Sequence, residues 1–303
     1  MALVTIAEVI VGLLLVSIAL HDMFHTLFHP SGRGAIAEFV SFRIWRLWRY
    51  IFADRHGLLS VAGPLAFLAT VFVWGALIVG GFALIYRPFL ISHFVMAPGL
   101  DIKGHNTAFD AVNVSLGSLI SMGGDFNTNS RWLRFAMGSE AVLGFVLLTA
   151  SLSWILSIYP ILEYRRSAAH RLSLLYHAYR VERVGISSTP EQETKELVIA
   201  LALDMTKIRN DLAQFPITYY FHEHDSPSAF PSALPLAMDV ASRATRVEAT
   251  EPVRIAGIVL QGAIHDLLSL VGRWFLEMPN ELDDEKLMRA LADDHFRKEL
   301  RSA

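Results

Sequence analysis

The side chains best suited to bind a ligand near the N-terminus are three histidines. His21, His25 and His29 recur every four residues, which places them along one face of a helix. Histidines at this spacing are typical of transition-metal ligands, and imidazole also titrates near neutral pH. The sequence therefore predicts a metal or proton sensor or, as the favoured alternative, histidines at a membrane interface that bond to backbone, arginines or neighbouring helices.

A second histidine pair lies in a proline-rich stretch of the C-terminal half. His222 and His224 are candidate ligands of a transition metal, with Glu223 or Asp225 completing the coordination shell. The cluster lacks helical spacing, so a solvated turn is the favoured alternative.

A third group of interest is the half-polar segment from Phe109 to Asp125, which lies between two long apolar runs. A bilayer tolerates irregular backbone at depth only where protein buries it or where it lines a watery path. Thr107 and Asp110 form a helix-capping pattern. We therefore expect a helix of about three turns, ending near Leu119 or Ile120.

The end of this predicted helix has the chemistry of a cation path. The partial negative charge at a helix C-terminus favours a cation. Gly123 and Gly124 supply the permissive backbone that a return of the chain requires, and a ring of Asp125 carboxylates would concentrate cations at the outer mouth. An ordinary outer turn at the two glycines is the alternative.

Three apolar runs are long enough to position these groups as transmembrane helices. They cover about Leu3–Leu20 with an amphipathic continuation to Phe28, then Leu58–Tyr86, then Phe135–Leu162. The hydrophobic content of 53% and the mean hydropathy of +0.41 exceed those of an ordinary soluble domain.

Basic residues near the ends of the runs orient them. They are Arg33, Arg43, Arg46, Arg49 and Arg55 after the first run, and Arg165, Arg166 and Arg171 after the third. We therefore expect an inner-membrane protein with its N-terminus outside and its C-terminal half in the cytoplasm. Over Phe42–Phe52 the arginines alternate with large apolar side chains, which predicts a helix in the headgroup region or, alternatively, an extension of a span.

Several of these residues resemble the pore region of two-span potassium channels. Phe109-Asp110-Ala111, Ser115 and the run from Ser118 to Asp125 match a pore helix of the type F-D-A-L-x-F-S followed by T-L-T-T-V-G-Y-G-D. The resemblance extends over about Leu58–Tyr159. The remainder is similar to bacterial ion-channel proteins with an extra N-terminal span. The resemblance implies four copies around one axis and a permeant monovalent cation, K⁺ or Na⁺.

The resemblance implies that the ion pathway is lined by Ser121, Met122, Gly123, Gly124 and Asp125. The sequence departs from the family pattern, because the aromatic residue between the filter glycines is missing and Ser121 stands in place of threonine. Successive backbone carbonyls replace the hydration shell of the ion in this family. The departure predicts a shorter filter with fewer ion sites and weaker selectivity, or a loop that does not conduct.

The third run looks like the inner helix of the same family. Gly138 and Gly144 lie where a gating hinge is often found, so both are candidate hinge residues. Glu140 is a candidate for bracing the filter from behind, as acids do in some relatives. A buried ion pair of Glu140 with Arg131 or Arg134 is the alternative.

The chain from residue 163 onward has the charge density of a soluble helical domain. One helix is expected to start with Thr189 as its cap and Pro190 in the first position, and to run to about Gln214. Further helices are expected from about Pro252 to Leu276 and, exposed, from Asn280 to Leu300. Sequence motifs of nucleotide-binding loops and zinc proteases are absent, so no enzyme is expected. A net charge of −3 without a separate basic block argues against nucleic acid as a partner, and the absence of cysteine excludes disulfides.

These patterns predict an all-α membrane protein. It has three transmembrane helices, a re-entrant pore helix and filter loop between the second and third, and a helical cytoplasmic domain. The expected domains are an N-terminal transmembrane helix (1–29), a cytoplasmic interfacial helix (30–56), a pore domain (57–162) and a helical domain (163–303).

The predicted function is a homotetrameric pore-loop cation channel that the cytoplasmic domain gates or assembles. Membrane lipid and the permeant cation are its expected partners, and no other cofactor is expected. A non-conducting sensor or scaffold of the same architecture is the alternative. A metal or proton transporter that uses the N-terminal histidines is a third hypothesis.

Overall fold

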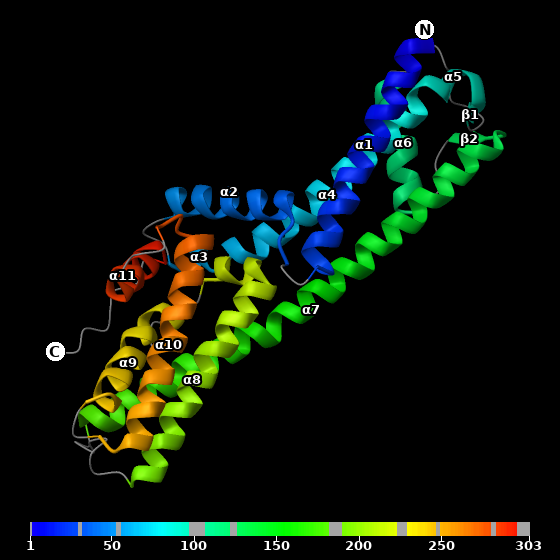
Figure 1. The fold of residues 1–303 in the computed structure, drawn as a ribbon. Coiled ribbons are helices and arrows are strands. Elements are labelled where there is room, and N and C mark those ends of the chain that lie inside the picture. The colour runs from blue at the N-terminus through cyan, green and yellow to red at the C-terminus, as the bar shows by residue number, and fades with distance from the viewer. Residues whose placement is uncertain are drawn as a thin grey trace. The chain divides into compact units, whose positions relative to one another are not determined.

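The computed structural model of the protein is almost entirely helical, as the sequence predicts (Figure 1). It describes residues 2–29, 32–52, 56–96, 107–121, 126–181, 190–222, 229–246, 249–279 and 283–295. The chain forms two compact units. The first contains Met1–Ser41 and Phe67–Leu156, and the second contains Phe42–Ala66 and Ser157–Ala303.

The first unit is built around three apolar helices. Its elements are α1 (Ala2–Leu27), the start of α2 (Ala35–Ile51), most of α4 (Ala62–Tyr86), η1 (Arg87–Phe89), α5 (Leu90–His93), β1 (Phe94–Met96), α6 (Thr107–Leu119), β2 (Phe126–Thr128) and the first half of α7 (Arg131–Val181). Glu8, a lone acid near the start of α1, forms an ion pair with Arg87 at 2.9 Å.

Four helices in the described part of the chain are long and apolar enough to cross a membrane, namely α1, α4, α7 and α10 (Glu251–Trp274). The first three coincide with the predicted spans. The helix α7 has 51 residues and continues without a break past residue 162, where the sequence suggested a domain boundary. The sequence predicted α10 to be a buried helix of the soluble domain, and half of its apolar stretch is buried inside the structure.

A two-stranded sheet is an addition to the predicted all-helical fold. Strands β1 and β2 are antiparallel, with Phe94 opposite Thr128. The Thr128 hydroxyl donates a hydrogen bond to the His93 carbonyl at 2.7 Å. The segment between the strands, which includes α6, therefore leaves and returns at one place. Strands of three residues are too short for an alternating pattern that sequence analysis could detect.

A buried carboxylate on α1 determines where α2 begins. Asp22 accepts hydrogen bonds from the backbone N–H groups of Ile36 and Ala37, at 2.7 and 3.2 Å. It also accepts one from the indole of Trp74 on α4 at 2.8 Å. First-turn N–H groups have no partner within their own helix, and a negative charge there is favourable. Asp22 therefore joins the end of α1 to the start of α2 and to α4.

We predict that Asp22→Ala lowers the free energy of unfolding by about 2 to 4 kcal/mol, because it removes a helix cap and leaves buried donors without a partner. Denaturation of the purified protein in mixed micelles measures this change. The control is Glu38→Gln, which removes an exposed partner of Arg33 and should cost at most about 1 kcal/mol. Equal effects of the two variants would contradict the role of Asp22.

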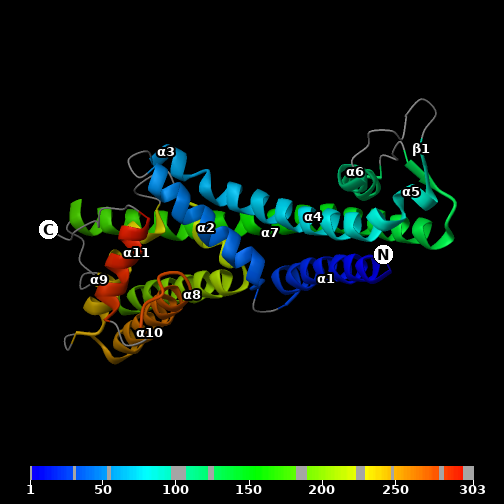
Figure 2. The ribbon, with the colours of Figure 1, turned by 90° about the horizontal axis from the view of Figure 1, so that it is seen from above.

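The second unit is a helical bundle. It contains α3 (His56–Leu59), α8 (Glu191–Gln214), η3 (Pro216–Tyr220), α9 (Phe230–Ala244), α10 and α11 (Asp284–Asp294), with parts of α2, α4 and α7. Helices α8, α9 and α10 lie side by side in both views (Figures 1 and 2). The predicted end of α8 is confirmed, and its start lies one residue later than predicted, with Pro190 at the N-cap.

One helix of the second unit was not predicted individually, and one prediction is wrong. The first is α9, which lies in a proline-rich region. Pro231 lies in its first turn, where backbone N–H groups have no partner within the helix, so the missing N–H of proline costs nothing there. Pro235 is accommodated inside the helix. The helix α11 was expected to be exposed, but it buries one side, consisting of Leu287, Met288, Leu291 and Ala292.

Asp294 joins the last described helix to α2 and η3. Its carboxylate accepts hydrogen bonds from the Trp45 indole at 3.0 Å and from the Tyr219 hydroxyl at 2.6 Å, and it pairs with Arg49. The Tyr219 ring stacks on Phe275 at 4.1 Å. Burial raises the pKa of the Tyr219 hydroxyl well above its usual value, and the charge of Asp294 raises it further. The phenol therefore remains a donor throughout the physiological pH range.

Candidate functional site

The short helix α6 lies at the centre of the candidate site, and it has the bounds that the capping pattern predicted. One side of the helix is buried, and it consists of Asp110, Ala111, Val114, Ser115 and Ser118. Three of these five side chains are polar. Buried polar groups are normally hydrogen-bonded, so the partners of this side define how α6 is held.

Ser115 connects α6 to both apolar helices that flank it in the sequence. Its hydroxyl contacts the backbone carbonyl of Val79 on α4 at 3.0 Å and the carboxylate of Glu140 on α7. The second oxygen of Glu140 accepts a hydrogen bond from the Tyr86 hydroxyl at 2.9 Å. Three helices therefore meet at one carboxylate, which is fully buried.

The contacts of Glu140 involve α4 and α6. Among the described residues, the Glu140 carboxylate accepts hydrogen bonds from Tyr86 and Ser115. The acid thus contacts the helix that precedes the predicted filter in sequence, and a role in bracing the filter stays a prediction. Sequence analysis missed Tyr86, although a hydroxyl at the end of a charge-free apolar run is a signal for a buried polar partner.

The C-terminal end of α6 lies directly against α7. A Cβ atom on Gly144 would overlap the carbonyl oxygen of Leu119. Gly144 therefore permits a close approach of two backbones. Gly138, the other predicted hinge residue, has open space at the corresponding position. Both glycines lie inside the uninterrupted helix α7.

Helix α6 ends in a backbone conformation that changes the direction of the chain. Ser121 has a φ of 55°, in the left-handed region that follows many helix C-termini. Its N–H group donates to the Ser118 carbonyl at 3.1 Å. The other residues of the predicted ion pathway, Met122, Gly123, Gly124 and Asp125, lie outside the described residues.

We predict that Ser115→Ala destabilises the protein by about 1 to 3 kcal/mol, because it removes a hydrogen-bond partner of a buried carboxylate. Denaturation in mixed micelles measures this effect. Ser139→Ala is the matched control, since the Ser139 hydroxyl bonds only to the carbonyl of Phe135 in its own helix. If Ser115→Ala remains as costly when Glu140 is replaced by Gln, the two side chains are not coupled.

The two glycines of α7 give a second prediction. Gly144→Ala should destabilise the protein by about 1 to 3 kcal/mol, because the new methyl group meets the Leu119 carbonyl. Gly138→Ala should be neutral or stabilise it by up to about 1 kcal/mol, because alanine is the better helix former. Unfolding midpoints of the two variants in one detergent make the comparison. Equal midpoints would show that α6 does not approach α7 at Gly144.

His21 and His25 lie on the last turns of α1, and His29 lies two residues beyond its end. The ring centroids of His21 and His25 are 4.3 Å apart, and those of His25 and His29 are 4.9 Å apart. The predicted helical placement is therefore confirmed for His21 and His25. Across the described ranges, no three histidine or acidic side chains are grouped closely enough to hold a metal ion.

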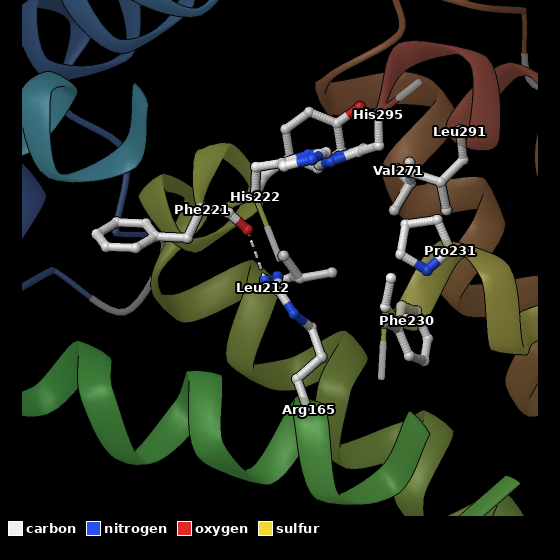
Figure 3. Close-up of a pocket in the computed structure, with 11 residues that line it drawn as sticks. Arg165, Leu212, Phe221, His222, Phe230, Pro231, Val271, Leu291 and His295 are labelled. Carbon is white, nitrogen blue, oxygen red and sulfur yellow. Dashed lines mark hydrogen bonds between the residues drawn. The ribbon is translucent and has the colours of Figure 1, made fainter. Parts of the chain in front are cut away.

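Only part of the second histidine cluster lies within the described residues. His224 lies outside them, whereas His222 is only 3% exposed. The prediction of a solvated turn is therefore wrong for His222. Its ring stacks in parallel on His295 at 6.0 Å, as Figure 3 shows. Another histidine of the second unit, His265, pairs instead with Asp284.

A small cavity of about 30 Å³ lies beside the two stacked histidines. Arg165 extends from α7 toward it and donates hydrogen bonds to the carbonyl oxygens of Thr218 and Phe221, both at 2.9 Å (Figure 3). The volume suits about one water molecule. The arginine, counted in the sequence as a membrane-flanking charge, thus also holds η3 against α7.

Comparison with known proteins gives one informative similarity. The chain is 26% identical over 217 residues to YdjJ, an uncharacterized membrane protein of Bacillus subtilis (strain 168). The similarity covers 71% of this chain, and the chain spans 62% of the length of that protein. No family model matches, and no solved structure matches. Together with the apolar helices, the similarity indicates a helical membrane protein with transmembrane helices.

Proposed function

We propose that this protein is a tetrameric pore-loop cation channel whose helical unit assembles or gates it. One observation carries the proposal. The short, half-polar helix α6 lies in sequence between two apolar helices, and it contacts both of them through Ser115. The paired strands β1 and β2 close the loop that contains it. A loop that returns to its starting point between two membrane helices has the form of a pore loop.

The proposed topology has three membrane spans, α1, α4 and α7. Helix α10 is excluded from the spans because it packs against α8, α9 and α11 in the helical bundle. The arginines between α1 and α4 and after the membrane part of α7 favour a cytoplasmic location for the helical unit. This orientation leaves the N-terminus and the loop containing α6 outside.

A cation is the preferred ion in this arrangement. Helix α6 enters from the outside, so its carbonyl end at Leu119 lies deeper in the membrane than its start. Asp125 follows in sequence and adds a negative charge at the mouth. The proposed ion pathway is the run from Ser121 to Asp125. Since this run lacks one residue of the potassium-channel pattern, we expect passage of both K⁺ and Na⁺.

A tetramer accounts for the side of α6 that one chain leaves uncovered. Its exposed residues include the apolar side chains of Phe109, Val112 and Leu116, and Ile120 follows directly after its end. These side chains lie outside the buried side that contains Ser115, and adjacent subunits around a pore would cover them. A ring of four identical loops also encloses a path that one loop cannot enclose.

The channel proposal predicts ion flux. Purified protein in liposomes should pass both K⁺ and Na⁺, and native mass measurement should give a tetramer. Gly123→Val should abolish the flux, because a branched side chain replaces the permissive glycine in the proposed pathway. The matched control is Gly262→Val on α10, where the added side chain meets open space and should leave the flux unchanged.

Two results would overturn the channel proposal. One is a flux equal to that of empty liposomes for both ions across a range of pH and calcium concentrations. The other is a flux that Gly123→Val and Gly262→Val reduce equally. In the first case, the proposed function becomes a non-conducting membrane sensor or scaffold.

A further inference from the structure

Helix α2 has a packed side and an exposed side. On the packed side, the Trp45 indole and Arg49 contact Asp294. The Trp48 indole donates to the Leu58 carbonyl at 2.8 Å. These contacts hold the C-terminal half of α2 against the other helices of the second unit. The opposite side of α2 therefore faces away from this unit.

The exposed side carries a continuous stripe of mixed character. We define the α2 stripe as Arg43, Arg46, Leu47, Tyr50 and Ile51, all exposed and spaced as one helix face. Tyr50 is 86% exposed and Leu47 54%. Large apolar side chains that are exposed next to cations need a partner that offers both an apolar region and negative charge.

The charge of this surface is positive. The stripe contains two arginines and no acid, and the one acidic residue of α2, Glu38, pairs with Arg33. The Arg46 guanidinium lies over the Phe42 ring at 4.3 Å, which keeps it close to the helix. Anionic groups are therefore the complement of the α2 stripe.

The start of α2 lies beside a membrane helix. Its first N–H groups bond to Asp22, in the last turns of the apolar helix α1. The stripe begins about two helical turns further along the same helix. In sequence, the stripe therefore follows closely after an apolar helix that is long enough to cross a membrane.

We propose that the α2 stripe is a binding surface for anionic phospholipids. Arg43 and Arg46 bind headgroup phosphates, while Leu47, Tyr50 and Ile51 enter the boundary between headgroups and acyl chains. A second copy of the chain fits this surface less well, because pairing two such stripes would bring four arginines together without an acid. The inference rests on the chain being a membrane protein and does not depend on ion conduction.

Site-specific labelling tests where the stripe lies. The chain has no cysteine, so Leu47→Cys gives a single site for a nitroxide label. Leu203→Cys on α8, 63% exposed, is the control site. In vesicles of phosphatidylcholine and phosphatidylglycerol, the label at position 47 should collide often with oxygen and rarely with a water-soluble nickel complex. The label at position 203 should show the reverse.

Two outcomes would overturn the lipid assignment. Equal nickel access at positions 47 and 203 would place the stripe in water. Low access to both reagents at position 47, with spin–spin broadening, would place a second copy of the chain on it.

A charge variant tests the lipid class. Arg43→Gln with Arg46→Gln should weaken the preference for phosphatidylglycerol over phosphatidylcholine by about 25-fold, since each basic side chain near an anionic surface contributes about fivefold. The control, Arg246→Gln with Arg254→Gln, removes two exposed arginines from the second unit. Native mass spectrometry of bound lipid measures the preference. An equal preference in both variants would refute the proposal, whatever the ion flux of the protein.

Discussion

The arrangement of the candidate channel unit depends on one buried carboxylate. Glu140 is fully enclosed by apolar helices, where an unbonded acid would be costly. Its hydrogen-bond partners, Ser115 and Tyr86, come from α6 and α4. The arrangement that satisfies the acid is therefore the same one that holds α6 against its neighbours. A helix of 13 residues is marginal by itself, so this tertiary contact gives α6 its position.

Local sequence signals were sufficient to predict most of the helices. They could not predict pairing between segments that are far apart in the chain. The capping pattern at the start of α6 and the proline before α8 are encoded within a few residues, so both helices begin within one residue of the predicted position. The strands β1 and β2 are too short to leave a pattern. The helix α9 was hidden by prolines that count against a helix except in its first turn.

The site shows the same division between local and distant information. Glu140 was predicted to support the filter, but its partner Tyr86 is 54 residues away in the chain. The burial of His222 depends on His295, which arrives on a helix that the sequence suggested was exposed. In each case the sequence identified the polar residue. The partner that contacts it is determined by how the helices pack. Such partners become predictable only when the helices are placed.

The way in which the chain passes between its two units bears on the proposed gating role. It crosses within the helices α2, α4 and α7 rather than in loops. A helix resists bending because its backbone hydrogen bonds must lengthen or break. In the proposed gating, the chain connections that could transmit motion between the units are therefore three helical segments. In α7, Pro160 lies four residues beyond the passage at Leu156 and lacks a backbone donor. Bending should consequently be easiest there.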